Sequence, residues 1–262
     1  MTLFNTNIIA IANQKGGVGK TTTVINLATA MAACNKKVLI IDSDPQGNAS
    51  TGLGLDKTVL KNSFYDLIRG DISINEVIVK TQIPNLFIIP TSMDLAVVEQ
   101  EFVNIEKREE RLKKEIEKLN TPFDYILIDC PPSLGLLTLN ALVACKNLLV
   151  PLQVEFYALE GLTQLMETVN QIKNNYNNLL TLQGIVLTMY DKRNKISELV
   201  ACDVKNFFKE KVYKTIIPRN VKISEAPSHG MPILMYDISC SGSQAYASLA
   251  AEIINQENKL NG

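Results

Sequence analysis

Short apolar runs alternate along the chain with longer segments in which apolar residues recur at helical spacing. The runs of strand length lie at residues 7–13, 37–42, 86–90, 124–130, 147–153, 183–189 and 212–217. They are apolar almost throughout, which is typical of parallel strands covered on both faces. Helical spacing predicts helices over 20–34, 94–119, 133–145, 157–176, 195–209 and 242–258. The alternation predicts one α/β domain over 1–262, a mostly parallel, doubly wound sheet with helices on both faces.

A glycine-rich turn joins the first predicted strand to the first predicted helix. It reads KGGVGKT, and its glycines let backbone N–H groups face inward, beside the positive end of the helix. In such a turn Lys20 reaches the β- and γ-phosphates, and the Thr21 hydroxyl coordinates Mg²⁺. The strict pattern GxxxxGK[ST] fails, because Gln14 replaces its first glycine and Lys15 adds a second lysine. The departure resembles the deviant Walker A form of the P-loop. The turn predicts a phosphate site formed by Lys15, Gly16, Gly17, Val18, Gly19, Lys20, Thr21 and Thr22.

Two other predicted strands end in carboxylates, at the edge of the sheet where open α/β folds bind ligands. Residues 37–42 run into Asp42 and Asp44, and Asp129 follows four apolar residues of the strand over 124–130. A buried carboxylate without a partner is costly, so Asp129 is predicted to face Mg²⁺. Because the single histidine lies in a loop flanked by Pro and Gly, we assign the attacking water to Asp44. The predicted metal site comprises Thr21, Asp44 and Asp129.

The composition of the chain excludes several classes of protein. The 262 residues carry 26 Lys+Arg and 27 Asp+Glu, a net charge of −1, which excludes a histone-like basic protein. The five cysteines contain no CxxC pair and are interpreted as reduced core residues. No apolar run approaches the ~20 residues of a membrane span, and no signal sequence is recognisable. A cytoplasmic protein without a membrane partner is expected.

Positive charge is concentrated in one segment of the chain. Residues 192–222 contain nine Lys/Arg and three Asp/Glu, a net charge of +6, so the other 231 residues together carry −7. Such a patch can bind a nucleic-acid backbone, and each neutralised phosphate contributes about −0.9 to the log–log salt slope. Lys205, Lys209 and Lys211 are also compatible with the solvated face of a helix.

Taken together, these strings resemble the ParA/Soj family of chromosome- and plasmid-partitioning ATPases, within the ParA/MinD class. The resemblance covers most of the chain and rests on NQKGGVGKTTT, DSDPQGNAS, DYILIDCPPSLG, GIVLTMYDKR and TIIPRNVKISEAPSHGMPI. The first three strings are common to the class. The last two are more specific to Soj-like members.

The resemblance implies a homodimer that sandwiches ATP and Mg²⁺ and binds double-stranded DNA without sequence preference. A ParB-type centromere-binding protein would stimulate an ATPase that is slow alone, and the protein would associate with the nucleoid. Lys15 would cross the dimer interface to the partner's nucleotide and act with Lys20 and Asp44 in catalysis, much as an arginine finger does.

The resemblance also implies contacts further along the chain. It assigns the adenine to Met189, Pro218 and Asn220, and DNA to Arg193, Arg219 and Lys222. One departure concerns the segment DISCSGSQAY after Tyr236, where Soj-like proteins commonly carry basic residues. No Lys or Arg lies between Lys222 and Lys259. DNA binding is then weaker or placed differently than in relatives, or relies more on the two arginines.

Three alternatives remain open at this level. A MinD-type positioning ATPase shares the P-loop but needs an amphipathic C-terminal helix for lipid, and the tail LAAEIINQENKLNG has no basic face. A metabolic or redox relative would be an iron–sulfur reductase or an ATP-dependent ligase. A cluster needs cysteines around a dimer axis, and Cys130, directly after Asp129, is interpreted as a small residue at the end of a strand. A ParA-like ATPase that positions a protein cargo would carry the same residues.

Overall fold

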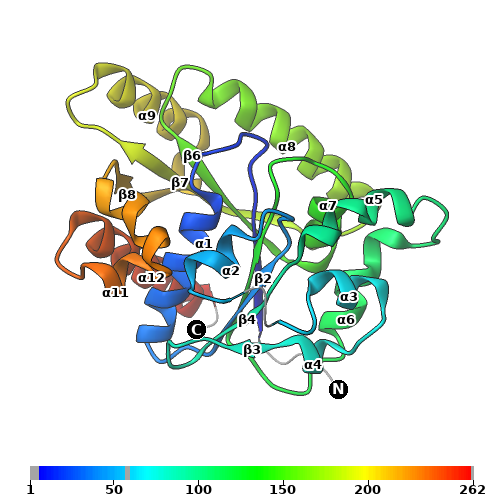
Figure 1. Ribbon diagram of the computed structural model, residues 1–262. Coiled ribbons are helices and arrows are strands. Elements are labelled where there is room, and N and C mark those ends of the chain that lie inside the picture. The colour runs from blue at the N-terminus through cyan, green and yellow to red at the C-terminus, as the bar shows by residue number, and fades with distance from the viewer. Residues whose placement is uncertain (1–5, 57–59, 261–262) are drawn as a thin grey trace.

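The computed structural model describes residues 6–56 and 60–260, in which eight strands form a single sheet (Figure 1). The strand order is β3-β4-β2-β5-β1-β6-β7-β8. All neighbouring strands run parallel except β3, which pairs antiparallel with β4. The strands are β1 (Asn7–Ile11), β2 (Val38–Asp42), β3 (Val79–Lys80), β4 (Leu86–Ile89), β5 (Tyr125–Asp129), β6 (Asn147–Gln153), β7 (Thr181–Tyr190) and β8 (Val212–Pro218). The predicted fold class is confirmed.

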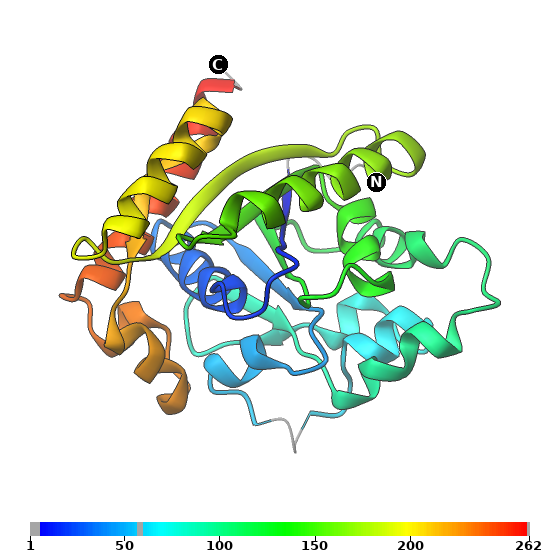
Figure 2. The same ribbon diagram turned by 90° about the horizontal axis from the view of Figure 1, so that it is seen from above.

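Helices pack on both faces of this sheet. The α-helices are α1 (Lys20–Ala33), α2 (Asn48–Gly52), α3 (Phe64–Arg69), α4 (Ile74–Val77), α5 (Val98–Glu101), α6 (Arg111–Ile116), α7 (Leu136–Ala144), α8 (Ala158–Asn175), α9 (Lys195–Phe208), α10 (Val221–Glu225), α11 (Ile233–Tyr236) and α12 (Ser241–Leu260). Short 3₁₀ helices are η1 (Met93–Val97), η2 (Arg108–Glu110), η3 (Lys209–Lys211) and η4 (Ala226–His229). Figures 1 and 2 place α9 and α12 at the same end of the sheet, where both contact β8.

Two hydrophobic cores, one on each face, explain why the strands are apolar throughout. Along β1, Ile8 and Ala10 belong to the core under α3 to α9, whereas Ile9 and Ile11 belong to the core under α1, α2, α11 and α12. Successive side chains of a strand point to opposite faces, so a strand covered twice needs apolar residues at every position. None of the helices among the described residues is both long and apolar enough to cross a membrane.

The C-terminal helices hold α1, which carries the glycine-rich turn. The Asn26 carboxamide of α1 accepts a hydrogen bond from the Ile233 backbone N–H at 2.7 Å. The hydroxyls of Thr23 in α1 and Tyr246 in α12 lie 3.3 Å apart. Both contacts are buried, so the end of the chain fixes the position of the turn at its beginning.

The prediction of one helix over 94–119 is wrong. The segment instead forms η1, α5, η2 and α6, and Lys107 between them has a left-handed φ of 53°. The Asn140 side chain explains the interruption, since it donates to the Arg108 carbonyl at 3.0 Å and accepts from the Leu112 N–H at 3.1 Å. A long-range partner thus satisfies backbone groups that a continuous helix would have paired internally.

The interpretation of all cysteines as core residues is also only partly correct. Cys130 and Cys145 are buried, but Cys34 and Cys202 are exposed, and all five are free. Each exposed cysteine belongs to the end or the outer face of a helix, where the surrounding apolar residues point the other way.

Candidate nucleotide-binding site

The turn between β1 and α1 has the geometry of an anion site. Gly17 and Gly19 have φ values of 75° and 90°, in the left-handed region that a side chain disfavours. A Cβ built on Gly16, Gly17 or Gly19 would meet nothing within 4 Å, so the space beside the turn is open. Gly19 is the N-cap of α1 and offers no side-chain cap, and the first turn contains no acidic residue. The first N–H groups of α1 are therefore available to a bound anion.

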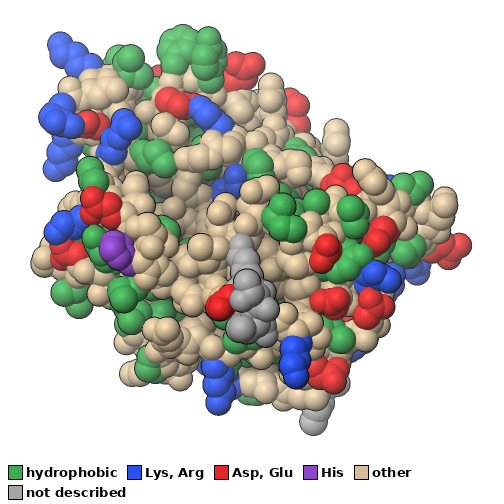
Figure 3. Space-filling view, in the orientation of Figure 1, with side chains coloured by type: hydrophobic (Ala, Val, Ile, Leu, Met, Phe, Trp, Pro, Cys, Tyr) green, Lys and Arg blue, Asp and Glu red, His purple; other side chains and the backbone are tan. Residues whose placement is uncertain are grey.

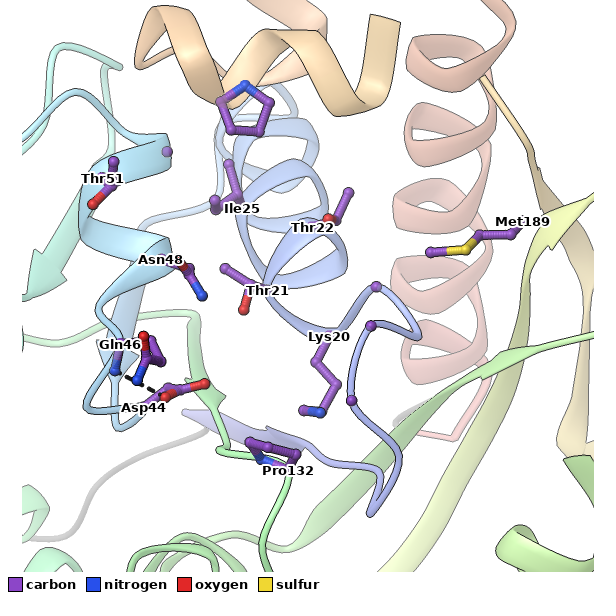
Figure 4. Close-up of a pocket in the computed structure, with 15 residues that line it drawn as sticks. Lys20, Thr21, Thr22, Ile25, Asp44, Gln46, Asn48, Thr51, Pro132 and Met189 are labelled. Atoms are coloured by element: carbon purple, nitrogen blue, oxygen red, sulfur yellow. Dashed lines mark hydrogen bonds between the residues drawn. The ribbon is translucent and has the colours of Figure 1, made fainter. Parts of the chain in front are cut away.

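A pocket of about 460 Å³ opens beside this turn (Figure 4). In Figure 4, Lys20 and Asp44 point into the same space, Lys20 from the start of α1 and Asp44 from the segment after β2. The lining residues come from the turn after β1, from α1, α2 and η4, and from the C-terminal ends of β2, β5 and β7 or the segments that follow them. This edge of the sheet is the position expected for a ligand in an open α/β fold. They are Gly16, Gly17, Gly19, Lys20, Thr21, Thr22, Ile25, Asp44, Gln46, Asn48, Thr51, Gly52, Pro132, Met189 and Pro227.

Lys20 is the cation of this pocket. Its side chain is only 7% exposed, and its ammonium donates to the Lys15 carbonyl at 3.1 Å. Burial lowers the pKa of Lys20, whereas the charges of Asp129, Cys130 and Asp44 raise it. A partly dehydrated ammonium attracts a phosphate more strongly than one in water, because the effective dielectric constant is lower.

Asp129 ends β5 as a fully buried carboxylate. Neither of its oxygens has a hydrogen-bond partner among the described residues. Burial raises the pKa of Asp129 well above its usual range, the adjacent Asp42 adds to this, and the nearby Thr21 hydroxyl and Lys20 ammonium oppose it. The parallel register places Asp42 beside Asp129 on neighbouring strands. Such an uncompensated carboxylate is stabilised by a cation.

The donor set fits Mg²⁺ bound together with a phosphate. Mg²⁺ favours one or two carboxylates, substrate phosphates and retained water over an all-protein cage. Thr21 lines the pocket and supplies a hydroxyl, and the buried Asp129 carboxylate lies near that hydroxyl. Within residues 6–56 and 60–260, no group of three or more His, Cys, Asp and Glu side chains forms a site of its own. The remaining ligands would come from the nucleotide and from water.

The two acids after β2 have different surroundings. Asp42 accepts hydrogen bonds from the N–H and the hydroxyl of Ser50 at 2.9 and 2.7 Å, and so holds the start of α2. Asp44 is 7% exposed, lines the pocket and accepts from the Gln46 N–H at 3.0 Å. Asp44 is therefore the acid of this pair that faces the pocket.

Lys15 differs from the other residues of the turn. It does not line the pocket, and its ammonium forms an ion pair with Glu155, just beyond β6. Its backbone N–H donates to the Asn13 side chain at 3.0 Å. The sequence motif contains Lys15 and Asn13, but it does not reveal the distant partner Glu155.

A second cavity, of about 330 Å³, adjoins the first. The two share Gly19, Thr22, Met189 and Pro227. All three residues predicted to contact the adenine line this cavity: Met189, Pro218 and Asn220. It is large enough for a planar base beside the phosphate turn, but that role stays a prediction.

Met189 reaches both cavities because the end of β7 is irregular. Its φ of 52° is in the left-handed region, which is uncommon for a side-chain-bearing residue, and the pairing of β7 with β8 shifts register between Leu187 and Tyr190. Irregular strand ends of this kind redirect side chains beside binding sites. Sequence periodicity contains no signal for such a shift.

Two buried side-chain hydrogen bonds connect the turn to neighbouring strands. The Thr188 hydroxyl of β7 donates to the Val18 carbonyl at 2.8 Å, and the Asn13 amide donates to the Pro151 carbonyl of β6 at 2.8 Å. Val18 is 1% exposed, so its side chain faces the core and only its backbone belongs to the turn. No signal in the sequence near the turn indicates Thr188, whose partner lies 170 residues away.

The predicted DNA-binding residues lie at the ends of β7 and β8. Arg193 and Arg219 line a third cavity of about 770 Å³, together with Lys192. Lys222 does not line it and instead pairs with Asp237. In the space-filling view, Lys and Arg side chains gather over the part of the molecule that contains α9 (Figure 3).

Comparison with known proteins identifies the family. The profile of a family described as "AAA domain" matches residues 6–182. The "Chromosome partitioning protein ParA" of Caulobacter vibrioides is 54% identical over 252 residues, which span 95% of this chain and 94% of that protein. The chain belongs to the ParA/Soj family of chromosome-partitioning ATPases. Another family member, the "Chromosome-partitioning ATPase Soj" of Treponema pallidum, is 49% identical and covers 96% of this chain and 98% of its own length.

Solved structures share the fold of this ParA/Soj protein over nearly its full length. A cobyrinic acid a,c-diamide synthase from Mycobacterium smegmatis with bound ADP and magnesium has a TM-score of 0.85 at 34% identity, covering 97% of this chain and 96% of that one. A putative plasmid partition protein from Borrelia burgdorferi bound to AMPPNP has a TM-score of 0.81 at 26% identity, covering 96% of this chain and 99% of that one. MinD of Pyrococcus horikoshii with Mg-ADP gives 0.76 at 26%, covering 95% and 96%.

Proposed function

We propose that this protein is an ATP- and Mg²⁺-dependent dimerising switch that binds DNA without sequence preference and segregates a chromosome or plasmid. A ParB-type centromere-binding protein stimulates its slow ATPase, and hydrolysis resets the switch on the nucleoid. The observation that carries the proposal is the pair of adjoining cavities around an uncapped helix N-terminus, with Lys20 and Asp44 facing into one of them. The M. smegmatis and P. horikoshii structures, with ADP and magnesium, support the choice of ligand.

The residues divide the work on the nucleotide. Backbone N–H groups of the turn and the Lys20 ammonium bind the phosphates, while Met189, Pro218 and Asn220 enclose the adenine. Thr21, Asp44 and Asp129 would hold Mg²⁺, which would withdraw charge from the phosphate oxygens. Asp44 faces the pocket and orients the attacking water, and its bond from Gln46 fixes its carboxylate for that task.

Lys15 completes the site of the partner chain. Its own pocket already contains Lys20, and the Lys15 ammonium is turned away toward Glu155. An exposed pair of this kind contributes only about 0–1 kcal/mol, so it is easily exchanged for a triphosphate of a second chain. An ammonium delivered in this way stabilises charge on the transferred phosphoryl group. Dimerisation and hydrolysis are thereby coupled.

The main alternative assignments are a MinD-type ATPase, an amide-forming ligase and a ParA-like ATPase with a protein cargo. The M. smegmatis synthase has a higher TM-score than the Borrelia plasmid partition protein, 0.85 against 0.81. Its sequence identity to this chain is 34%, however, well below the 54% of the Caulobacter protein. The full-length similarity to chromosome-partitioning proteins favours a segregation role over the first two. A protein cargo would use the same nucleotide chemistry and is distinguished only by the bound partner.

Retention of DNA under different nucleotides tests the proposal. Wild-type protein is mixed with nonspecific duplex DNA at low salt, with ATP, with ADP or without nucleotide, and retention on a filter is measured. Retention is expected with ATP only, and Arg193→Ala, at a residue that lines the third cavity but neither nucleotide cavity, should reduce it while ATP binding persists. Arg69→Ala in α3 is the matched control. Arg69 is also an exposed arginine paired with an aspartate, Asp71, but it lies far from the cavity at the ends of β7 and β8. Equal retention under all three conditions would refute the switch.

A further inference from the structure

Acidic side chains neutralise half of the cations at the proposed DNA-binding edge. Four cations lie at the ends of β7 and β8: Lys192, Arg193, Arg219 and Lys222. Arg193 forms a bidentate contact with Asp191, from Nε at 3.0 Å and from Nη2 at 2.7 Å. Lys222 forms an ion pair with Asp237. Within the part of the chain that the structure describes, Lys192 and Arg219 form no ion pair.

Asp237 is held in place independently of Lys222. It follows α11, and its Oδ1 accepts hydrogen bonds from the N–H and the hydroxyl of Ser239 at 2.9 and 2.6 Å. Its Oδ2 contacts the Lys222 ammonium. Lys222 and Ser239 lower the pKa of Asp237 to about 2, so the carboxylate is ionised throughout the neutral range.

The Asp237 carboxylate also acts on a phosphate that approaches Lys222. The side chain of Lys222 is 51% exposed, so a nucleic-acid phosphate can reach it, whereas Asp237 is 17% exposed and stays beneath. A duplex that approaches Lys222 must share the ammonium with this fixed negative charge, and like charges repel across a distance of a few ångströms. No Lys or Arg in residues 223–258 compensates for the lost attraction.

We propose that Asp237 limits the DNA affinity of this protein by neutralising Lys222 at the edge formed by β7 and β8. The inference rests on the proposed function, and assigns to one carboxylate the setting of its DNA-binding strength. The kind of ligand is any phosphodiester backbone, because the contact offers charge without base recognition.

The substitution Asp237→Asn tests the charge without removing the local structure. The carboxamide oxygen still accepts from Ser239, so the turn before α12 is retained, while the negative charge is lost. Each chain then gains one phosphate contact, which steepens the log–log salt slope by about 0.9 per chain and about 1.8 per dimer. At ~0.1 M salt the same relation gives an affinity gain of roughly 8-fold per chain.

Two further variants separate this effect from a general change in charge. Glu110→Gln removes one negative charge from an acid that pairs with Lys114 at 3.0 Å on the surface of α6, far from the edge. It should leave the salt slope unchanged. Adding Lys222→Ala to Asp237→Asn should abolish the gain, because the released cation is then absent.

Salt-dependent binding of nonspecific duplex DNA, measured with ATP for all four proteins, decides between the outcomes. A steeper slope for Asp237→Asn alone supports the inference. An unchanged slope, or an equal gain in Glu110→Gln, overturns it while the proposed function stands. Wild-type protein that binds no DNA with ATP overturns both. Equal thermal unfolding of the variants shows that differences in binding do not come from folding.

Discussion

The hydroxyl of Thr188 should be worth a measurable share of both stability and nucleotide affinity. It is 2% exposed and donates at 2.8 Å to the carbonyl of Val18, in the middle of the phosphate turn. Thr188→Val keeps the size and branching of the side chain but leaves this buried carbonyl without its donor. The loss of this donor should lower the free energy of unfolding by about 1–3 kcal/mol. For a chain of this size each kcal/mol lowers the melting temperature by about 2–4 °C.

The turn itself should also loosen in Thr188→Val, so ATP binding should weaken along with stability. Calorimetric unfolding and fluorescence titration with a labelled ATP analogue measure the two effects. Thr163→Val is the matched control, since the exposed Thr163 hydroxyl of α8 donates to the Leu159 carbonyl at 2.9 Å and water can replace it. Its effect should stay within about 0.5 kcal/mol. If both variants behave alike, the β7 contact does not support the turn.

Further outcomes follow from the buried Asp129 and the partly buried Glu257. Asp129→Asn should stabilise the protein by about 1 kcal/mol or more without nucleotide, because it removes an uncompensated charge, and should abolish Mg²⁺-dependent ATP binding; a less stable variant that still binds Mg-ATP would contradict the assignment. Burial raises the pKa of Glu257 above 4.5, so the folded state holds its proton more tightly than the unfolded state, and this contribution to stability is lost as pH rises through the folded pKa. Urea unfolding across that pH range should show a downward slope that is shallower in Glu257→Gln, whereas equal slopes would exclude a contribution of Glu257.

The local pattern of hydrophobic residues was sufficient to predict most strands and long helices of the fold. The predicted runs match β1, β2, β4, β5, β6, β7 and β8, because strands buried on two faces are apolar at every position. The two-residue β3 and the short helices α2, α3, α4, α10 and α11 were not predicted, since so few residues establish no periodicity. The helix expected over 94–119 failed for a different reason, namely the contacts that Asn140 makes from α7.

The candidate site likewise contains residues that the sequence predicts and residues that it does not. The strand, turn and helix around Lys20 are contiguous in sequence, so their glycine spacing predicts the pocket directly. Thr188 of β7 and Glu155, just beyond β6, contact the turn from positions far along the chain, and nothing near the motif indicates them. The left-handed conformation of Met189 depends on the pairing of β7 with β8 and is equally invisible in sequence.

The claim that Lys15 acts on the partner's nucleotide has one direct test, the ATPase rate of mixed variants. Lys15→Ala and Asp44→Ala should each be inactive alone, because every site in either homodimer lacks one of the two groups. In a mixed dimer, the site of the Lys15→Ala chain keeps Asp44 and receives Lys15 from its partner.

Random pairing makes half of the dimers mixed, each with one complete site of two, so an equimolar mixture should recover about a quarter of the wild-type rate per site. The rate is measured with DNA and the ParB-type partner present. Recovery to that level is the predicted result. A mixture as inactive as its components would contradict the account, because Lys15 would then serve only its own chain.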